Sequence, residues 1–309
     1  MKKTIIASAI AAVVAAPAAF ADVSISGNVN MELQDKDATT GWGNSTNTDL
    51  VFKASEDLGN GMKAGMKYHL FNDDGGNSVA DTTVNLSGDF GSINAGRQET
   101  MNMAYFHGFA AGDAAHDMTL EDSNGQQARG NAVIYTSPSM NGLTVAVGAV
   151  VGGGVIADGS TDSSETDNID TTDFMAKYSN GPLTVAVGQT TQKGSIADAE
   201  ITNIAASYKM GDLKVAVLNR DVENGREASD SSSNTSTSGT NELTTVSLTY
   251  TMGANTIYAG VTDSDDAQDG DTVVTLKHAM SKRTSVYVGF KDDDSAGDTN
   301  TLVGIKHSF

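Results

Sequence analysis

The sequence predicts an all-β protein, an antiparallel barrel of sixteen strands that crosses a membrane. Three observations indicate this class: an export signal at the start, apolar–polar alternation over long segments, and an aromatic residue at the end. A tilted strand that crosses a bilayer needs roughly 9–11 residues, whereas a typical strand in a soluble protein has roughly 5–6. The alternating segments of this chain have the longer length, so we expect them to lie in a bilayer.

The first 21 residues have the pattern of a secretory signal peptide. Lys2 and Lys3 precede an apolar run from Thr4 to Phe20, and Ala19-Phe20-Ala21 supplies a small-x-small cleavage site. We therefore expect residues 1–21 to be removed, which leaves residues 22–309 as one barrel domain.

Composition excludes several classes of partner and site. The whole chain carries a formal charge of −20, and loss of Lys2 and Lys3 makes the mature chain −22. This acidity argues against nucleic acid as a partner. The chain has no Cys, which excludes disulfides and thiolate metal sites. We expect no metal and no cofactor.

Alternation identifies the strands in order along the chain. In residues 23–33 the odd positions carry Val, Ile, Gly, Met and Leu, while the even positions carry Ser, Asn and Glu. The same period of two returns in residues 62–70, 143–151, 183–187 and 285–291. Side chains of a strand point alternately to its two faces, so each segment has one apolar and one more polar or smaller face.

The connections between these strands alternate between short and long. Seven are short turns, the first at Asp57–Gly61, and short turns at one rim with long loops at the other are typical of outer-membrane barrels. Eight are long and polar: Gln34–Asn47, Asn72–Asp81, Glu99–Ala128, Gly152–Asp170, Thr190–Ala199, Asp221–Asn241, Asp263–Asp271 and Asp292–Thr299. Fifteen connections join sixteen strands, and pairing of the first strand with the last would remove the edges of the sheet.

The last strand ends on Phe309, with Thr301, Val303, Ile305 and His307 on the same face. An aromatic C-terminal residue on such a strand is the signal that the barrel-assembly machinery of Gram-negative bacteria recognises. We therefore expect Phe309 to be an assembly signal, the assembly machinery and outer-membrane lipids to be partners, and the protein to reside in the outer membrane.

Five segments, in order along the mature chain, resemble Gram-negative general diffusion porins. They are Ser55–Gly61, Gly88–Gln98, Asn131–Pro138, Ser281–Tyr287 and Lys306–Phe309. The resemblance implies a homotrimer of barrels that passes ions and small hydrophilic solutes without chemistry. It also implies that the third long loop folds into the lumen as a constriction, and that the second loop, Asn72–Asp81, latches the trimer.

By the same resemblance, the constriction loop is Glu99–Ala128. Its acidic candidates are Asp113, Asp117, Glu121 and Asp122, and its basic counterparts are Arg97 and Arg129. Strict alternation puts Arg97 on the lipid face with Ile93 and Ala95. An arginine there costs about 2–4 kcal/mol near the bilayer midplane, so we expect a bulge or strand end to turn Arg97 inward.

The basic lumen wall that the resemblance implies is thin in this chain. Lys53 and Lys67 are present, but Asn28 and Asp49 stand at two positions where enteric porins carry basic residues. Together with the acidic loops, this predicts a weak preference for cations.

Other functions have weaker support in the sequence. A substrate-specific channel would show an aromatic track along the lumen, for which Tyr258 and Tyr287 are the candidates. A non-conducting barrel that acts as an adhesin would need larger inward residues, and a secreted β-sandwich binding module would need shorter strands. His107 and His116 lie in the third loop, but no Ser has the context of a nucleophile elbow, so we expect no enzyme. The acidic segment Asp263–Asp271 lacks two features of an EF-hand calcium loop, so we expect a solvated loop.

Overall fold

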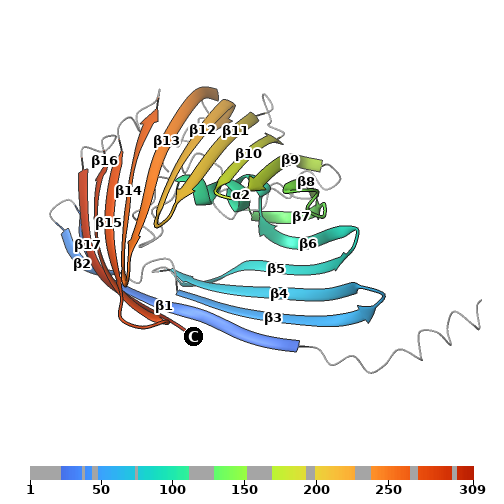
Figure 1. Ribbon diagram of the computed structural model, residues 1–309, viewed down its shortest axis with the longest axis horizontal. Coiled ribbons are helices and arrows are strands. Elements are labelled where there is room, and N and C mark those ends of the chain that lie inside the picture. Colours follow the sequence, from blue (N-terminus) through green and yellow to red (C-terminus); the bar gives the residue numbers. More distant parts are fainter. Residues whose placement is uncertain are drawn as a thin grey trace, which may run out of the picture.

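The computed structural model describes residues 22–36, 39–43, 48–73, 76–110, 129–151, 169–192, 199–226, 238–264, 271–293 and 298–309. One antiparallel sheet contains all of its strands and curves round until it closes (Figure 1). The predicted signal peptide lies outside the described residues.

The strands follow the chain from one rim of the barrel to the other and back. They are β1 (Asp22–Lys36), β2 (Thr39–Gly43), β3 (Thr48–Gly59), β4 (Met62–Asp73), β5 (Gly76–Gly88), β6 (Gly91–Glu99), β7 (Arg129–Thr136), β8 (Leu143–Val151), β9 (Ile169–Asn180), β10 (Leu183–Gln192), β11 (Ala199–Met210), β12 (Leu213–Arg226), β13 (Ser238–Met252), β14 (Asn255–Ser264), β15 (Thr272–Ala279), β16 (Thr284–Asp293) and β17 (Asp298–Ser308). A single helix, α2 (Met101–Ala110), is present among the described residues.

Closure comes from the pairing of β1 with β17 on one side and with β3 on the other. The remaining long strands each pair with their neighbours in the sequence, and the short β2 pairs with the outer end of β1. Sixteen strands therefore form the wall, and β2 is an extension of the first long loop. This confirms the predicted sixteen-stranded barrel, in which no edge strand is left unpaired in the bilayer.

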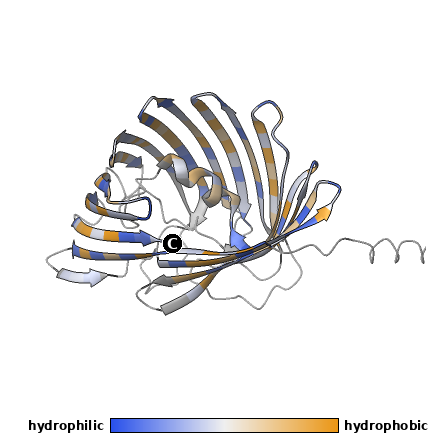
Figure 2. Ribbon diagram, turned by 60° about the horizontal axis from the view of Figure 1, so that its bottom comes forward, coloured by the Kyte–Doolittle hydropathy of each residue, from blue (hydrophilic) through white to orange (hydrophobic). Residues whose placement is uncertain are grey.

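The two faces of the wall differ in chemistry, and Figure 2 shows the resulting alternation of apolar and polar bands along the strands. On β1, Val23 and Ile25 are 70% and 57% exposed, whereas Asn30 and Glu32 on the other face are 1% and 0% exposed. Apolar side chains exposed in this way are explained by contact with lipid. The face of Asn30 and Glu32 is therefore the lumen face, and cross-strand register carries this assignment round the barrel.

The short turns have the residues that tight turns require. Asn60 and Asn141 have φ of 52° and 53°, and Gly181, Gly211 and Gly253 have φ between 55° and 59°. A positive φ costs Gly nothing and is tolerated by Asn, which is why these residue types reverse the chain so sharply. We call this end of the barrel the turn rim and the opposite end the loop rim.

At the loop rim the strands extend further than the alternation predicts. The predicted second loop, Asn72–Asp81, is wrong in its bounds, because only residues 74–75 separate β4 from β5. Asp81 lies within β5 and pairs with His69 of β4. Likewise β12 runs to Arg226 and β13 starts at Ser238. Backbone pairing continues through these segments, where polar side chains on both faces remove the period-two signal.

Helix α2 lies inside the barrel, against the wall formed by β9 to β13 (Figure 1). It follows β6 directly, so the third long connection does enter the lumen as predicted. No helix in the described part of the chain is long and apolar enough to span a membrane.

Candidate pore constriction

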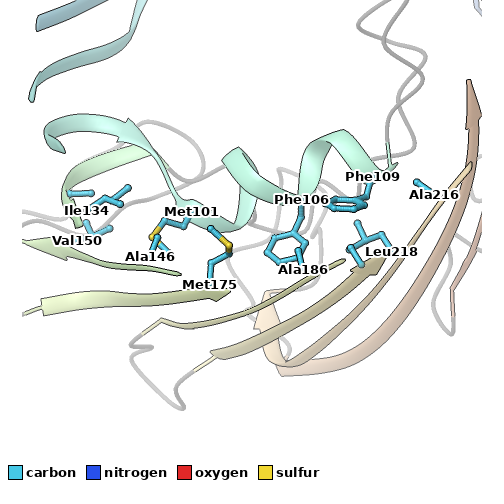
Figure 3. Close-up of a cluster of buried hydrophobic side chains, with 12 residues drawn as sticks. Met101, Phe106, Phe109, Ile134, Ala146, Val150, Met175, Ala186, Ala216 and Leu218 are labelled. Carbon is cyan, nitrogen blue, oxygen red and sulfur yellow. The ribbon is translucent and has the colours of Figure 1, made fainter. Parts of the chain in front are cut away.

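Small and apolar residues on the lumen face of neighbouring strands hold α2 against the barrel. We call this surface the helix-binding wall; it comprises Ala146, Met175, Ala186, Gly188, Ala205, Ala216 and Leu218. Phe106 is 1% exposed and Phe109 is 6% exposed, and both lie against this wall (Figure 3). Full burial of a side chain such as Phe contributes about 1.5–3 kcal/mol, so the two rings hold the helix in place.

Gly188 shows how closely the helix approaches the wall. A Cβ atom added at Gly188 would lie 2.6 Å from a ring carbon of Phe106. Real Cβ contacts are never that short, so the Phe106 ring needs glycine at this position. The small residues of β10 to β12 are therefore the surface on which the aromatic side of α2 rests.

Polar side chains of the barrel bind both ends of α2. At its N-terminus the Asp173 carboxylate accepts a hydrogen bond from the Met101 N–H at 3.4 Å and another from the Thr190 hydroxyl at 2.6 Å. At its C-terminus Lys214 Nζ donates to the Gly108 carbonyl oxygen at 2.8 Å, and Ser247 Oγ donates to the Phe109 carbonyl oxygen at 2.7 Å.

These contacts match the electrostatics of a helix. The first N–H groups and the last carbonyl groups have no partner inside the helix, and the helix dipole favours an anion at the start and a cation at the end. Asp173 and Lys214 supply charges of those signs. The wall therefore fixes both the position and the direction of α2.

Across the lumen, a chain of polar contacts joins β1, β3, β4 and β5. We call it the polar wall; it comprises Asn28, Asp49, Lys67, His69 and Asp81. Its strands lie about half a turn of the barrel away from β9 to β13 in the order of the sheet. Helix α2 and the polar wall thus face each other across the pore.

His69 is the centre of the polar wall. Its Nε2 lies 2.7 Å from Asp49 Oδ1, and its Nδ1 lies 3.2 Å from Asp81 Oδ2. An ionised carboxylate only accepts hydrogen bonds, so the ring form that donates to both partners is the doubly protonated imidazolium. His69 then offsets the charge of one carboxylate. These side chains do not form a metal site, because among the described residues no group of three or more His, Asp or Glu side chains could hold a metal ion.

Lysines and Asn28 complete the polar wall and its surroundings. Lys67 Nζ lies 2.6 Å from Asp81 Oδ2, and the Asn28 amide donates to Asp49 Oδ2 at 2.7 Å. Lys53 is exposed and sits directly opposite Lys67 in the cross-strand register. The predicted lumen residues Asn28, Asp49, Lys53 and Lys67 therefore lie on one side of the pore.

The expected position of Arg97 is wrong. The register of β6 with β5 and with β7 is unbroken, so no bulge turns Arg97 inward. It shares the outer face with Ile93 and Ala95, as strict alternation requires, and its Nε donates to the Val79 carbonyl oxygen at 3.2 Å. The outward position of Arg97 has to be compensated by something other than a bulge.

The remaining predicted constriction residues are not placed by the structure. Arg129 opens β7, where its backbone pairs with Glu99, and its side chain lies outside the described residues. Asp113, Asp117, Glu121 and Asp122 fall in residues 111–128, which also lie outside them. Their role in the constriction stays a prediction.

The C-terminal residue completes the seam of the barrel. Phe309 exchanges backbone hydrogen bonds with Gly27 at 3.0 and 3.2 Å, which extends the pairing of β17 with β1 to the last residue. The predicted assembly signal thus sits at the turn rim, where the sheet closes.

Sequence reasoning missed the residues that hold α2 and the centre of the polar wall. Asp81 was placed in a loop, and Asp173 and Lys214 lie on strands with weak or ordinary patterns. A signal did exist, because the lumen face of β8 to β12 carries Ala146, Met175, Ala186, Ala205 and Ala216 where a wet pore wall would be polar. An apolar patch on the lumen face predicts something packed against it.

Comparisons with known proteins agree with this architecture. The family model of Gram-negative porins matches residues 7–298. The chain is 29% identical over 260 residues to outer membrane porin protein 32 of Delftia acidovorans. The matched region covers 71% of this chain and 69% of that protein.

Solved structures show the same fold at low sequence identity. An anion-selective porin from Comamonas acidovorans matches with a TM-score of 0.71 and 21% identity, over 94% of this chain and all of that one. OmpF of Salmonella typhi, in complex with daunomycin, matches with a TM-score of 0.74 and 14% identity, over 94% of this chain and 97% of that one.

Proposed function

The chain belongs to the Gram-negative porin family, and we propose that it lets ions and small hydrophilic solutes diffuse passively across the outer membrane. The observation that carries this proposal is the closed sixteen-stranded barrel whose lumen face bears solvated lysines such as Lys53. A barrel of this size encloses an aqueous channel. The outer membrane is where the family resides.

The narrowest region, in this proposal, lies between α2 and the polar wall. The helix occupies one side of the lumen, and Asp49, His69 and Asp81 stand on the other. The acidic residues Asp113, Asp117, Glu121 and Asp122 follow α2 in the chain, so we place them in or near this passage. Steric exclusion and fixed charge at this level set which solutes pass.

Single-channel recording in a planar bilayer tests the proposal. Purified folded protein should give discrete conductance steps in KCl as single channels insert into the bilayer. Vesicles that contain it should swell in isotonic solutions of small sugars. Deletion of Ala111–Asp122 should raise the conductance and admit larger sugars, because it removes volume from the passage. A folded barrel that gives no conductance steps would overturn the proposal and favour an adhesin.

The sign of the selectivity is the finer part of the proposal. The formal charge of −22 and the substitutions Asn28 and Asp49 support a weak cation preference. The lumen face supports the opposite sign, because Lys53, Lys67, Lys306 and other lysines line it. We retain weak cation preference as the hypothesis. The reversal potential in a KCl gradient decides, and chloride preference would show that the lysines dominate.

A homotrimer is the assembly that we propose. One structural relative, OmpT of Vibrio cholerae, was solved in a trimer form and matches with a TM-score of 0.66 and 15% identity. Arg97 adds support from this chain, because an outward arginine is costly in lipid and less so against protein. We therefore place a subunit contact over β5 and β6. Native mass measurement in mild detergent tests it, and a monomer would refute it.

The substrate-specific alternative loses one of its two aromatic candidates. Tyr287 is 3% exposed and its hydroxyl bonds Asn30 and Glu32, so its ring belongs to the wall and not to a track for solutes. Tyr258 remains on the lumen face beside Lys277, with its hydroxyl 2.9 Å from Lys277 Nζ. One partly buried ring does not make a track, so general diffusion is the better-supported function.

A further inference from the structure

The turn between β15 and β16 differs in charge from the other short turns. It contains Lys282 and Arg283, which are adjacent in the chain and exposed. The turns after β5 and β11 each contain an acid, Asp89 and Asp212, and no other turn in the described part of the barrel contains Lys or Arg. The turn rim therefore has one position at which two positive charges lie together.

Hydrogen bonds fix the conformation of this turn. The Ser281 hydroxyl oxygen accepts from the backbone N–H groups of Arg283 at 3.1 Å and of Thr284 at 3.0 Å. The Met280 N–H donates to the Thr284 carbonyl oxygen at 2.9 Å, and the Ser308 N–H donates to the Arg283 carbonyl oxygen at 2.8 Å. The turn is thus tied both to its own base and to the last strand, so the barrel sets the backbone positions of the two bases.

No acidic side chain stands on the neighbouring strand ends to neutralise these bases. Residues 249–258, 275–287 and 302–309, which form the turn-rim parts of β13 to β17, contain no Asp or Glu. The acid in this region is the C-terminal carboxylate of Phe309, a residue whose backbone bonds Gly27 of β1. Among the described residues, no ion pair joins Lys282 or Arg283 to an acid. This part of the turn rim is therefore basic, although the mature chain carries a formal charge of −22.

Two histidines extend this basic region onto the outer face of the barrel. Lys277 and Lys306 face the lumen, so the adjacent His278 and His307 face outward, and both are exposed. His307 pairs with Thr284 at the edge of the turn, and its Nδ1 lies 2.9 Å from the Thr284 hydroxyl oxygen. We call His278, Lys282, Arg283 and His307 the basic rim patch.

Further from the turn, the outer face of the same three strands is apolar. Cross-strand register places its outward residues in rows across β15, β16 and β17, which lie side by side (Figure 1). These residues are between 43% and 52% exposed: Val274, Leu276, Val288, Phe290, Val303 and Ile305. Apolar side chains exposed on the outer face of a barrel contact acyl chains. The three strands therefore present an apolar surface at bilayer depth and positive charge at its edge.

We propose that the basic rim patch binds the phosphate group of an anionic phospholipid whose acyl chains lie on this apolar surface. Short turns of outer-membrane barrels lie on the periplasmic side, so the lipid belongs to the periplasmic leaflet. Arg binds phosphate oxygens through paired hydrogen bonds, and Lys adds a point charge. A soluble polyanion would need the turn alone, whereas the outward histidines and the apolar rows above them match a headgroup joined to acyl chains.

Native mass spectrometry of the folded protein in mild detergent tests this site. The probes are dimyristoyl phosphatidylglycerol, which is anionic, and dimyristoyl phosphatidylcholine, which has the same chains and no net charge. We expect the wild-type protein to bind the anionic lipid about ten- to thirtyfold more tightly, because each Lys or Arg at a membrane surface strengthens binding of anionic lipid about fivefold. In the variant with Lys282→Gln and Arg283→Gln together, the two lipids should bind about equally.

Matched variants separate the patch from charge in general. Lys63→Gln with Lys209→Gln removes two exposed lysines near other turns on the lumen side, and this variant should keep the preference for the anionic lipid. Arg283→Lys keeps the charge and should retain most of the preference, which distinguishes lipid binding from a structural role of the turn. All variants must show the heat-modifiable band of a folded barrel.

Two further arms distinguish the lipid from other anions. An excess of glycerol 3-phosphate should leave the bound phosphatidylglycerol in place, and its displacement would show that the patch takes free phosphate esters. Sedimentation with purified cell-wall sacculi that the double Gln variant loses, without any preference between the lipids, would assign the patch to the cell wall. Either result would overturn the proposal.

Equal binding of the two lipids by the wild-type protein would also overturn it, as would a preference that survives loss of Lys282 and Arg283. The proposed function is judged separately, by conductance steps, because the patch lies on the outer face and the lumen is unchanged in the Lys282 and Arg283 variants.

Discussion

The two sides of the lumen differ in chemistry, one being lined by small apolar residues and the other by polar residues. The helix-binding wall on β8 to β12 is dry, with small apolar residues beneath Phe106 and Phe109. The polar wall on β1 to β5 is made of hydrogen-bonded polar side chains, with His69 in contact with both Asp49 and Asp81. The same alternation of inward and outward residues produces both walls. The difference shows that the polarity of the inward residues of a strand depends on whether water or another part of the protein lies over them.

Loss of the contacts of Phe106 and Phe109 with the helix-binding wall should have the largest effect on the difference between the two sides. Phe106→Ala with Phe109→Ala removes two buried rings, each worth about 3–5 kcal/mol in a packed core. Helix α2 should then leave its wall, and single-channel current should become noisy or change in level. Phe290→Ala is the control, because Phe290 is 43% exposed on the outer face. Quiet, unchanged channels in the double variant would mean that other contacts hold the helix.

Removal of the charges at the helix ends should have a smaller effect. A charge at a helix terminus contributes up to about 2 kcal/mol in a partly buried site. Asp173→Asn and Lys214→Met should each increase open-channel noise. The double variant should show more noise than either single variant. Lys209→Met, directly opposite Lys214, is the matched control, because among the described residues Lys214 and not Lys209 donates a hydrogen bond to α2. Equal noise in Lys209→Met and Lys214→Met would contradict the proposed role of Lys214.

On the polar wall, Asp49→Arg should move the selectivity toward anions. The change is two charge units, and one unit at about 8 Å in water corresponds to about 0.5 kcal/mol, which screening at about 0.1 M salt reduces to about 0.2 kcal/mol. Potassium and chloride shift by this amount in opposite directions. We therefore expect the ratio of potassium to chloride permeability to fall about four- to sixfold at low salt. The reversal potential in a KCl gradient measures it. No movement would mean that ions do not pass near Asp49.

The smallest expected change comes from His69→Ala. It removes the group between Asp49 and Asp81, so one more negative charge acts on the pore and the potassium to chloride ratio should rise about twofold. His278→Ala, on an exposed position of β15, should leave the ratio unchanged. A fall in the ratio after loss of His69 would show that the two carboxylates are not ionised in the folded pore.

Much of the fold was predictable because strand alternation is a local signal. The sixteen strands, the short turns and the entry of the third connection into the lumen follow from periods, turn residues and the resemblance to porins. Strand ends at the loop rim were less predictable, because polar residues on both faces give no period where hydrogen bonding continues, as in Gly76–Asp81. Arg97 shows the opposite case. The alternation correctly predicted that it lies on the outer face, and the argument from the cost of an arginine in lipid, which predicted an inward position, was wrong.

By itself the sequence determined the class of the protein, its topology and which residues face the lumen, since each depends on periods and turns within a few residues. The tertiary structure alone decided which lumen residues meet. His69 with Asp49 and Asp81, and Asp173 and Lys214 with the two ends of α2, come from strands that only barrel closure and register bring together. Closure places strands distant in sequence across one narrow pore, and no local pattern records which residues will face each other there.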